Sequence, residues 1–262
     1  MLQAIIFDVD GTLAETEEVH RAAFNRAFAD AGLDWNWSEA LYGDLLKVTG
    51  GKERLASYIE MTGGLGMSVL GVERLIADLH RTKTAIYAQM MAGGQVTLRP
   101  GVAELIEGAL IDDIRLAIAT TTSRPNVDAL LRSTLGADGL AAFEVIAAGD
   151  SVPRKKPAPD VFVATLAGLG LPAENCIAIE DSENGLRSAI GAGLATVVTP
   201  SHYSRGENFA GAARVVEALP ALAEPEPGRI AAPTPSQLVE ALRALHRAAL
   251  ARPSGHAFAT AI

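Results

Sequence analysis

The chain has 262 residues, of which 49% are hydrophobic and 20% are charged, a composition typical of globular proteins. Its length allows one large domain or two unequal ones. The formal net charge of −9 argues against general nucleic-acid binding, which needs a basic face. It does not exclude an anionic small substrate, because a few local cations and a metal ion can reverse the potential inside one cleft.

The sequence favours a cytoplasmic protein with no membrane partner. No apolar stretch approaches the roughly 20 residues of a membrane span, and the first residues lack a basic region followed by an apolar signal core. The single cysteine, Cys176, excludes an internal disulfide framework. We therefore expect a cytoplasmic location, and both a monomer and a homodimer remain open.

Five short apolar runs predict β-strands, at residues 4–7, 114–119, 143–148, 176–180 and 195–199. Helical segments separate the later runs. The segments 125–135 and 157–169 carry proline near the first turn, and Ser182 is a good N-cap for a helix that reaches Gly191. This alternation predicts an α/β fold, a doubly wound parallel sheet with right-handed crossovers.

The segment that begins near residue 15 shows amphipathic helical patterns and no convincing strand. We expect an α-helical cap at 15–94, with hinges near Ala14 and near residues 92–96, where paired glycines suit a flexible connection. The catalytic core would then comprise residues 1–14 and 95–223. Residues 224–262 are predicted to form a proline-rich linker and an appended helix at 236–251, with Leu238, Leu242 and Leu245 on one face.

Polar side chains follow the predicted strands at the point where each strand should end, and one lysine lies on a loop beyond the third. They are Asp8, Asp10, Thr120, Thr121, Lys156, Glu180 and Asp181. Because ligands of an open parallel sheet bind beyond the carboxyl ends of its strands, we expect these groups to meet at one edge. Gathered carboxylate oxygens suit Mg²⁺, which would offset the repulsion between Asp8 and Asp10.

Asp8 and Asp10 can take separate roles in phosphoryl transfer. Asp8, at the strand end, can attack in line and form an aspartyl-phosphate. Asp10 can protonate the leaving oxygen and later deprotonate the attacking water. Lys156 can pair with Asp8 and hold the phosphoryl group, to which the Thr120 hydroxyl can also donate.

Four motifs occur in order, DVDGT, ATTTS, KKPAPD and EDSENG, and together they resemble those of the haloacid dehalogenase superfamily of phosphotransferases over roughly residues 1–222. The resemblance implies a Rossmann-like core with an inserted α-helical cap. It implies Asp8 as nucleophile, Asp10 as acid/base, Thr120 as phosphate-binding hydroxyl and Lys156 as the motif lysine. It also implies Mg²⁺ as cofactor, with Asp8, Asp10, Glu180 and Asp181 as candidate ligands.

Within that superfamily the chain resembles the CbbY group, on the stretches FDVDGTLAETEEVHRAAFN, TGGKER, DLHRTKT, LRPG, LAIATTTS, VIAAGD and NFAGA. These are phosphatases associated with the Calvin cycle that hydrolyse xylulose-1,5-bisphosphate, an inhibitor of Rubisco. The resemblance therefore implies a phosphorylated sugar as the small-molecule partner. The linker and helix after about residue 224 fall outside the pattern.

The second phosphate of a sugar bisphosphate needs donors at a distance from Asp8. Backbone N–H groups of Gly50 and Gly51, at an expected helix start, and the charges of Lys52 and Arg54 offer them, and the HRTK stretch adds Arg81 and Lys83. The full set of expected substrate contacts is Glu17, His20, Tyr42, Gly50, Gly51, Lys52, Arg54, His80 and Thr121.

Three other functions stay open at this point. A β-phosphoglucomutase-type sugar phosphate mutase and a phosphatase for another sugar phosphate would use the same motifs. A binding or regulatory protein on a phosphatase scaffold could dispense with Asp8, Asp10, Lys156 and Asp181, yet all four are present.

Overall fold

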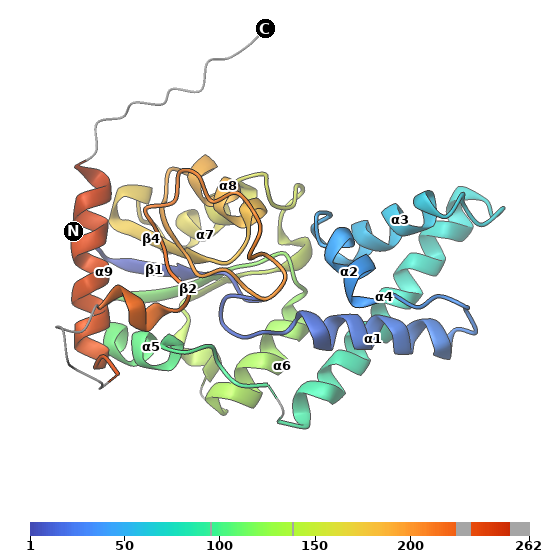
Figure 1. The fold of residues 1–262 in the computed structure, drawn as a ribbon, viewed down its shortest axis with the longest axis horizontal. Coiled ribbons are helices and arrows are strands. Elements are labelled where there is room, and N and C mark those ends of the chain that lie inside the picture. Colours follow the sequence, from blue (N-terminus) through green and yellow to red (C-terminus); the bar gives the residue numbers. More distant parts are fainter. Residues whose placement is uncertain (95, 138, 224–231, 252–262) are drawn as a thin grey trace, which may run out of the picture.

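The computed structural model describes residues 1–94, 96–137, 139–223 and 232–251, which divide into an α/β part and a helical part (Figure 1). Six strands of these residues form a parallel sheet in the order β3-β2-β1-β4-β5-β6. The central strand β1 (Ala4–Phe7) pairs with β2 (Arg115–Ala119) and β4 (Cys176–Glu180). The predicted doubly wound parallel sheet is confirmed.

The strands toward the two edges are shorter than predicted. β3 (Val145–Ala147) covers half of the predicted run, and β5 (Ala195–Val198) ends one residue early. β6 (Arg214–Val215) was not predicted, because two exposed residues leave no apolar run to detect.

Both faces of the sheet are covered by helices. Ile5 and Phe7 belong to the larger core, which packs under α5 (Val102–Ile111), α6 (Arg124–Leu135) and α9 (Pro235–Leu250). Ala4 and Ile6 belong to a second core under α7 (Asp160–Leu169) and α8 (Glu183–Gly191). Burial on both faces explains why the strand sequences read as continuous apolar runs rather than as alternating patterns.

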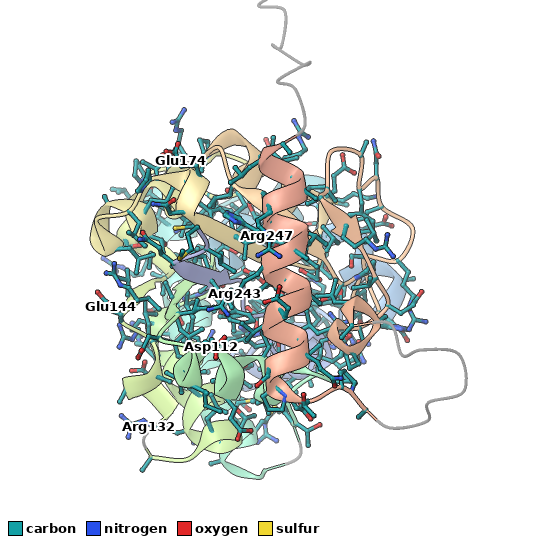
Figure 2. The ribbon with its side chains drawn as sticks, turned by 90° about the vertical axis from the view of Figure 1, so that its left-hand side faces the viewer. Asp112, Arg132, Glu144, Glu174, Arg243 and Arg247 are labelled. Carbon is teal, nitrogen blue, oxygen red and sulfur yellow. The ribbon has the colours of Figure 1, made fainter. Side chains whose placement is uncertain are left out.

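The predicted C-terminal helix is confirmed as α9 (Pro235–Leu250), which starts one residue early because Thr234 and Gln237 form a capping box. Leu238 and Leu242 are fully buried in the larger core, and Leu245 is partly buried against it. Arg243 of α9 also donates to Asp112, 2.6 Å away, at the end of α5 (Figure 2). The predicted linker at 224–231 lies outside the described residues.

The helical part consists of α1 (Glu17–Asp30), α2 (Glu39–Leu45), α3 (Gly51–Met61) and α4 (Val69–Ala92), as the sequence patterns predicted. It has a core of its own, rich in aromatic rings: Phe24, Phe28, Trp37, Tyr42, Leu45, Leu55 and Leu79. Ala23 of α1 and Tyr87 and Met91 of α4 belong instead to the larger core on the sheet, so the helical part packs both on itself and on the α/β part.

Two chain segments join the helical part to the sheet, at the places where hinges were expected. Ala14 forms an isolated antiparallel bridge with Leu98, and Arg99 N donates to Leu13 O at 2.8 Å. Four short 3₁₀ turns connect other elements, at Gly139–Ala142, Gly149–Ser151, Ala173–Asn175 and Leu219–Leu222. No helix among the described residues has the length and apolar character needed to cross a membrane.

Candidate active site

One cavity lies between the carboxyl edge of the sheet and the helical part. Asp8 follows β1 and Thr120 follows β2, and each continues the ladder through its backbone N–H, to Ile179 O and Ala147 O. The cavity is lined by Asp8, Asp10, Glu17, His20, Phe24, Leu46, Thr49, Gly50, Gly51, Arg54, His80, Lys83, Thr120, Thr121, Thr122, Ser123, Asn126, Lys156, Asp181, Ser182, Asn184, Ser201, Tyr203, Ser204 and Glu207. Most of the predicted site residues are therefore brought together.

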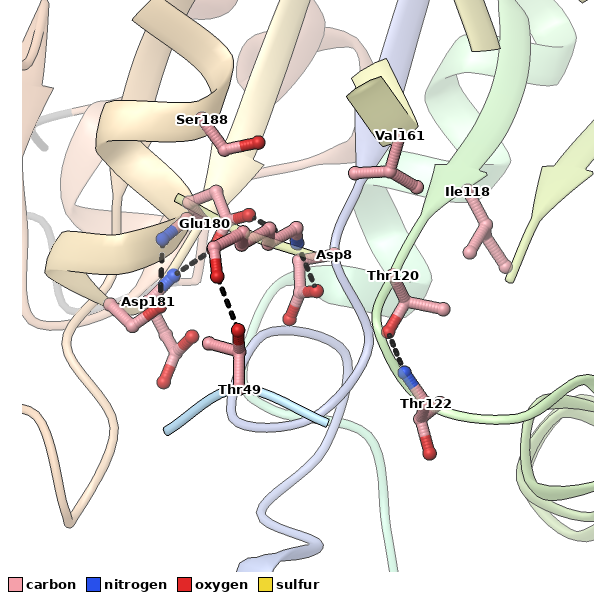
Figure 3. A network of polar contacts seen from close by, with 12 residues as sticks. Asp8, Thr49, Ile118, Thr120, Thr122, Val161, Glu180, Asp181 and Ser188 are labelled. Atoms are coloured by element: carbon pink, nitrogen blue, oxygen red, sulfur yellow. Dashed lines mark hydrogen bonds and ion pairs between the residues drawn. The ribbon is translucent and has the colours of Figure 1, made fainter. Parts of the chain in front are cut away.

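Lys156 contacts two carboxylates at this edge of the sheet. Its Nζ lies 2.6 Å from Asp8 Oδ1 and 2.6 Å from Glu180 Oε1, and all three side chains are buried (Figure 3). Helix α7 begins at Asp160, three residues later than predicted, because residues 155–158 instead form a turn closed by Ala158 N and Lys155 O. That turn directs Lys156, rather than its neighbour, to Asp8.

Asp8, Glu180 and Asp181 form a buried oxygen cluster whose ligand atoms lie within 4.8 Å of one another. Burial raises the pKa of Asp181 well above its usual range, and the charges of Asp8 and Glu180 add to the effect. Burial also raises the pKa of Asp8 to about 8, although Lys156 opposes it. Burial alone would lower the pKa of Lys156, but Asp8 and Glu180 raise it overall. One ammonium among three carboxylates leaves excess negative charge.

A divalent cation with hard oxygen ligands fits this cluster. Its donors are all carboxylates, and the residual charge is the kind that a bound cation neutralises. The chain also approaches closely here: a Cβ on Gly11 (φ +82°) would lie 2.2 Å from Asp181 Oδ2. Glu180 belongs to the cluster but does not line the cavity, because its Oε1 accepts from Lys156 and its Oε2 from Asp181 N.

Asp10 lies in different surroundings and outside that cluster, although the sequence grouped it with the metal ligands. Its Oδ1 accepts from Thr16 Oγ1 at 2.5 Å, and His20 Nε2 lies 2.8 Å away. Burial favours the neutral form of Asp10, but His20, Thr16 and Lys83 outweigh burial and lower the pKa of its carboxyl. The helical part thus holds Asp10 as an anion.

Lys83 continues this contact inward, with Nζ 2.5 Å from His20 Nδ1. Since a carboxylate only accepts, the Nε2 of His20 donates to Asp10, and Nδ1 is left to accept from the ammonium. Burial lowers the pKa of Lys83 to about 7, while the charge of Asp10 opposes that shift. His20 also stacks on Tyr87, with ring centroids 4.2 Å apart. Arg81, from the same stretch, instead pairs with Asp78 at the surface.

Tyr42 supports the wall of the cavity from behind. It is fully buried and does not line the cavity, so it is not a direct substrate contact in this structure. Its hydroxyl donates to Glu17 Oε2 at 2.7 Å and accepts from Arg54 NH1 at 3.1 Å. Burial, with the charge of Glu17, raises the pKa of Tyr42 well above its usual value. Glu17 and Arg54 themselves face the cavity.

The start of α3 forms part of the cavity wall. The glycine pair had predicted a helix start at this place. Gly50 is the N-cap, with φ +94°, and a Cβ on Gly51 would lie 2.9 Å from the His80 ring. Gly50, Gly51, His80 and Thr121 line the cavity, whereas Lys52 does not.

Several lining residues were not among the sequence candidates. Thr49 donates its hydroxyl to the carbonyl of Lys156, which joins the helical part to the lysine loop (Figure 3). Asn126 is buried; its Nδ2 donates to Thr122 Oγ1, and its Oδ1 has no partner among the described residues. Asn126 lies on the first turn of α6, shortly after ATTTS, which was the only sequence signal for it.

Residues 2–193 match the family model of the haloacid dehalogenase-like hydrolases. The chain belongs to this family. It is 58% identical over 211 residues to Protein CbbY of Rhodobacter capsulatus, and the match covers 80% of this chain and 91% of that protein. The predicted membership of the CbbY group of phosphatases is thereby confirmed.

Two crystal structures of CbbY from Rhodobacter sphaeroides share the fold. One is a complex with phosphate and the other, of a variant, a complex with xylulose-(1,5)bisphosphate. Each has a TM-score of 0.79 and covers 83% of this chain and 95% of its own, at 51% and 50% identity.

Proposed function

We propose that this phosphatase is Mg²⁺-dependent and cytoplasmic, and that it hydrolyses xylulose-1,5-bisphosphate through an aspartyl-phosphate on Asp8. The observation that carries the proposal is the contact of Lys156 with Asp8, beside a buried oxygen cluster, in a cavity that Arg54 and the start of α3 also line. The CbbY relative that binds xylulose-(1,5)bisphosphate supports the same substrate.

The reaction has two displacements. A carboxylate oxygen of Asp8 attacks the phosphorus, the bond from phosphorus to the sugar oxygen breaks, and Asp10 gives that oxygen a proton. Because its neighbours hold Asp10 as an anion, it takes up this proton from water before the first displacement. Water then attacks the phosphorus of the aspartyl-phosphate and gives a proton to Asp10, and phosphate leaves Asp8. Lys156 and the Thr120 hydroxyl face the transferring oxygens, where positive charge and donors lower the barrier.

Asp8 and Asp181, with Glu180 in the same cluster, would hold Mg²⁺. When bound, it supplies positive charge to the phosphoryl oxygens. The carboxylate of Asp10 is engaged by Thr16 and His20, so we assign it to proton transfer rather than to the metal.

The side of the cavity formed by the helical part fits the second phosphate. The backbone N–H groups at the start of α3 and the guanidinium of Arg54 both face it, and an anion at a helix N-terminus is favoured by the unpaired donors there. Arg54 is held by Leu45 O and by Tyr42, so its position is fixed before the ligand arrives. His80 lies beside the same glycines, whereas Glu17 and His20 lie closer to the sugar.

Release of inorganic phosphate with Mg²⁺ tests the substrate. We expect xylulose-1,5-bisphosphate to give the highest kcat/KM in a panel with ribulose-1,5-bisphosphate, fructose-1,6-bisphosphate, glucose 6-phosphate and β-glucose 1-phosphate. A higher kcat/KM for a monophosphate would overturn the role of Arg54 and α3. Conversion of β-glucose 1-phosphate to its isomer faster than phosphate release would instead identify a mutase.

Replacement of the nucleophile tests the intermediate. Asp8→Asn should lower kcat by roughly 10⁴-fold or more, because the amide of Asn cannot form the aspartyl-phosphate. Asp44→Asn, which changes the same charge on the surface of α2, is the matched control. Mass spectrometry of an acid-quenched reaction should show a phosphoryl adduct on wild type and none on Asp8→Asn; substantial activity in Asp8→Asn would rule out this mechanism.

A further inference from the structure

The loop that follows β5 faces both halves of the molecule. The root of this loop, residues 199–201 and Ser204, lies beside the oxygen cluster. Ser204 Oγ donates to Asp181 O at 2.7 Å, and Ser201 N donates to Ser204 Oγ at 2.8 Å. Ser201 and Ser204 are both buried. The root is therefore fixed to the end of the strand that carries Asp181.

Arg99, on the second connection to the helical part, fixes the same root. Its NH1 donates to Thr199 O at 2.6 Å, and its NH2 donates to Pro200 O at 2.8 Å. NH1 also donates to the carbonyl of Gly11, in the turn after Asp8. A guanidinium whose backbone acceptors lie both in this loop and in the turn after Asp8 leaves the loop little freedom at this end.

Between the two serines the chain turns outward to the helical part. The Tyr203 hydroxyl donates to the carboxylate of Glu18 on α1, and its ring meets Tyr42 edge-on, with centroids 5.8 Å apart. The ring also covers Gly43, where a Cβ would lie 3.4 Å away. Tyr203 lines the cavity, and the Tyr42 that it contacts holds both Glu17 and Arg54.

The neighbouring His202 makes a contact of a different kind. Its Nε2 lies 2.7 Å from Glu39 Oε1, but both side chains are more than half exposed. Water screens such a pair, so it contributes little to holding two parts together. The hydrogen bond of Tyr203 to Glu18 is exposed as well, but Tyr203 itself is half-buried and its ring also packs on Tyr42, so Tyr203 makes the stronger contact.

We infer that Tyr203 is a positioning residue that latches the helical part onto the core and so places Glu17 and Arg54 over the phosphate at Asp8. The inference rests on the proposed function only in that a phosphate group must bind at Asp8, whichever sugar carries it. When the helical part is held against the core, Glu17, Arg54 and the residues around Asp8 surround one substrate, and the access of water is limited.

Kinetics test the latch through a double-mutant cycle. We expect kcat/KM for xylulose-1,5-bisphosphate to fall about threefold in Tyr203→Phe and in Glu18→Gln, and no further in the double variant, because both weaken the same hydrogen bond. Glu18→Gln also weakens the ion pair with Arg21, but that pair lies within α1 and does not join the two parts. Tyr203→Ala, which also removes the ring, should lose about tenfold. Two variants serve as controls, His202→Gln and Tyr58→Phe, and their kcat/KM should stay within twofold of wild type. Tyr58 belongs to the aromatic core of the helical part. Independent, additive losses from Tyr203→Phe and Glu18→Gln would overturn the latch.

A distance measurement tests closure without any turnover. Spin labels on Met61→Cys of α3 and Leu110→Cys of α5, both exposed, report the separation of the two parts. With inorganic phosphate and Mg²⁺, the short-distance population should dominate in the wild-type background and fall severalfold with Tyr203→Phe or Tyr203→Ala. Equal populations in all three backgrounds would overturn the inference, whereas inactivity toward xylulose-1,5-bisphosphate alongside a normal shift would overturn only the proposed substrate.

Discussion

Asp8 and Asp10 lie two residues apart, yet they belong to two regions with opposite electrostatics. Asp8 is part of the sheet edge, where three buried carboxylates share one ammonium. Asp10 follows the same strand but contacts the helical region, where this one carboxylate is matched by Thr16, His20 and Lys83. The pKa of Asp8 is raised and that of Asp10 is lowered.

The difference separates the roles of two chemically identical side chains. The sheet edge has more negative charge than its protein partners neutralise, which is the environment of a cation site. The helical region is already balanced and can hold and pass a proton without a metal. Pairs of titratable groups whose surroundings push their pKa values apart are typical of divided acid, base and nucleophile roles.

Removal of Lys156 should give the largest effect on stability. Lys156→Met leaves Asp8 and Glu180 buried without their shared cation, so we expect a loss of about 3–5 kcal/mol in the free energy of unfolding without metal. Lys155→Met, one residue away, removes a part-buried contact to Gly149 O and no contact to Asp8 or Glu180, and should cost about 1 kcal/mol. Chemical denaturation with EDTA measures both, and equal losses would contradict the charge imbalance at the sheet edge.

The sheet edge could be predicted from sequence because β-strands end at definite residues. Asp8, Thr120 and Asp181 directly follow apolar runs, and parallel strands bring their carboxyl ends to one edge. Even there the sequence could not show that Glu180 turns inward to Lys156, because the choice between lining a cavity and supporting a neighbour is made by packing.

In the helical region the sequence predicted the helices and most of the cavity-lining residues, but not how the side chains contact one another. Lys83 was proposed as a cation for a second phosphate, whereas it lies 2.5 Å from His20 Nδ1. Tyr42 was proposed as a sugar contact, whereas it is fully buried. Which face of α1, α2 or α4 meets the next helix depends on the crossing of all of them, and no local pattern specifies that geometry.

Replacement of Lys83 tests the helical region through pH. Its pKa is about 7 in the folded protein against 10.5 for an ordinary lysine, so between these values the unfolded chain binds one proton more. This group therefore makes the folded protein more stable as pH rises, by up to about 1.4 kcal/mol per pH unit. The stability gap between wild type and Lys83→Met should grow in favour of wild type from pH 7.5 to 9.5.

The control for this measurement is Lys47→Met, which removes an exposed lysine paired with Asp44. Its gap from wild type should stay constant over the same range. A constant gap for Lys83→Met as well would mean that Lys83 keeps its proton, and that the helical region carries a full charge like the sheet edge.

Metal binding tests the sheet edge with a smaller effect. At ten times its dissociation constant, Mg²⁺ should raise the free energy of unfolding by about 1.4 kcal/mol, because it binds only the folded cluster. Asp181→Asn removes a ligand oxygen and should abolish the gain, whereas Asp112→Asn, outside the cluster, should keep it. Thermal unfolding with and without Mg²⁺ measures this stabilisation. An unchanged stabilisation in Asp181→Asn would show that Mg²⁺ binds at another site.

The smallest effect concerns the wall behind the cavity. Tyr42→Phe removes the hydroxyl that joins Glu17 to Arg54, but both partners line the cavity and can be rehydrated. The stability cost should therefore be about 1 kcal/mol, the net value of an ordinary hydrogen bond.

The same variant should also change substrate binding. Arg54 keeps its bond to Leu45 O, so it stays near the proposed position of the second phosphate but is less precisely oriented. We expect KM for xylulose-1,5-bisphosphate to rise a few-fold with kcat nearly constant, since the lost interaction acts equally on the bound substrate and the transition state. Tyr58→Phe should change neither constant; a fall in kcat alone for Tyr42→Phe would instead connect this wall to the chemistry at Asp8.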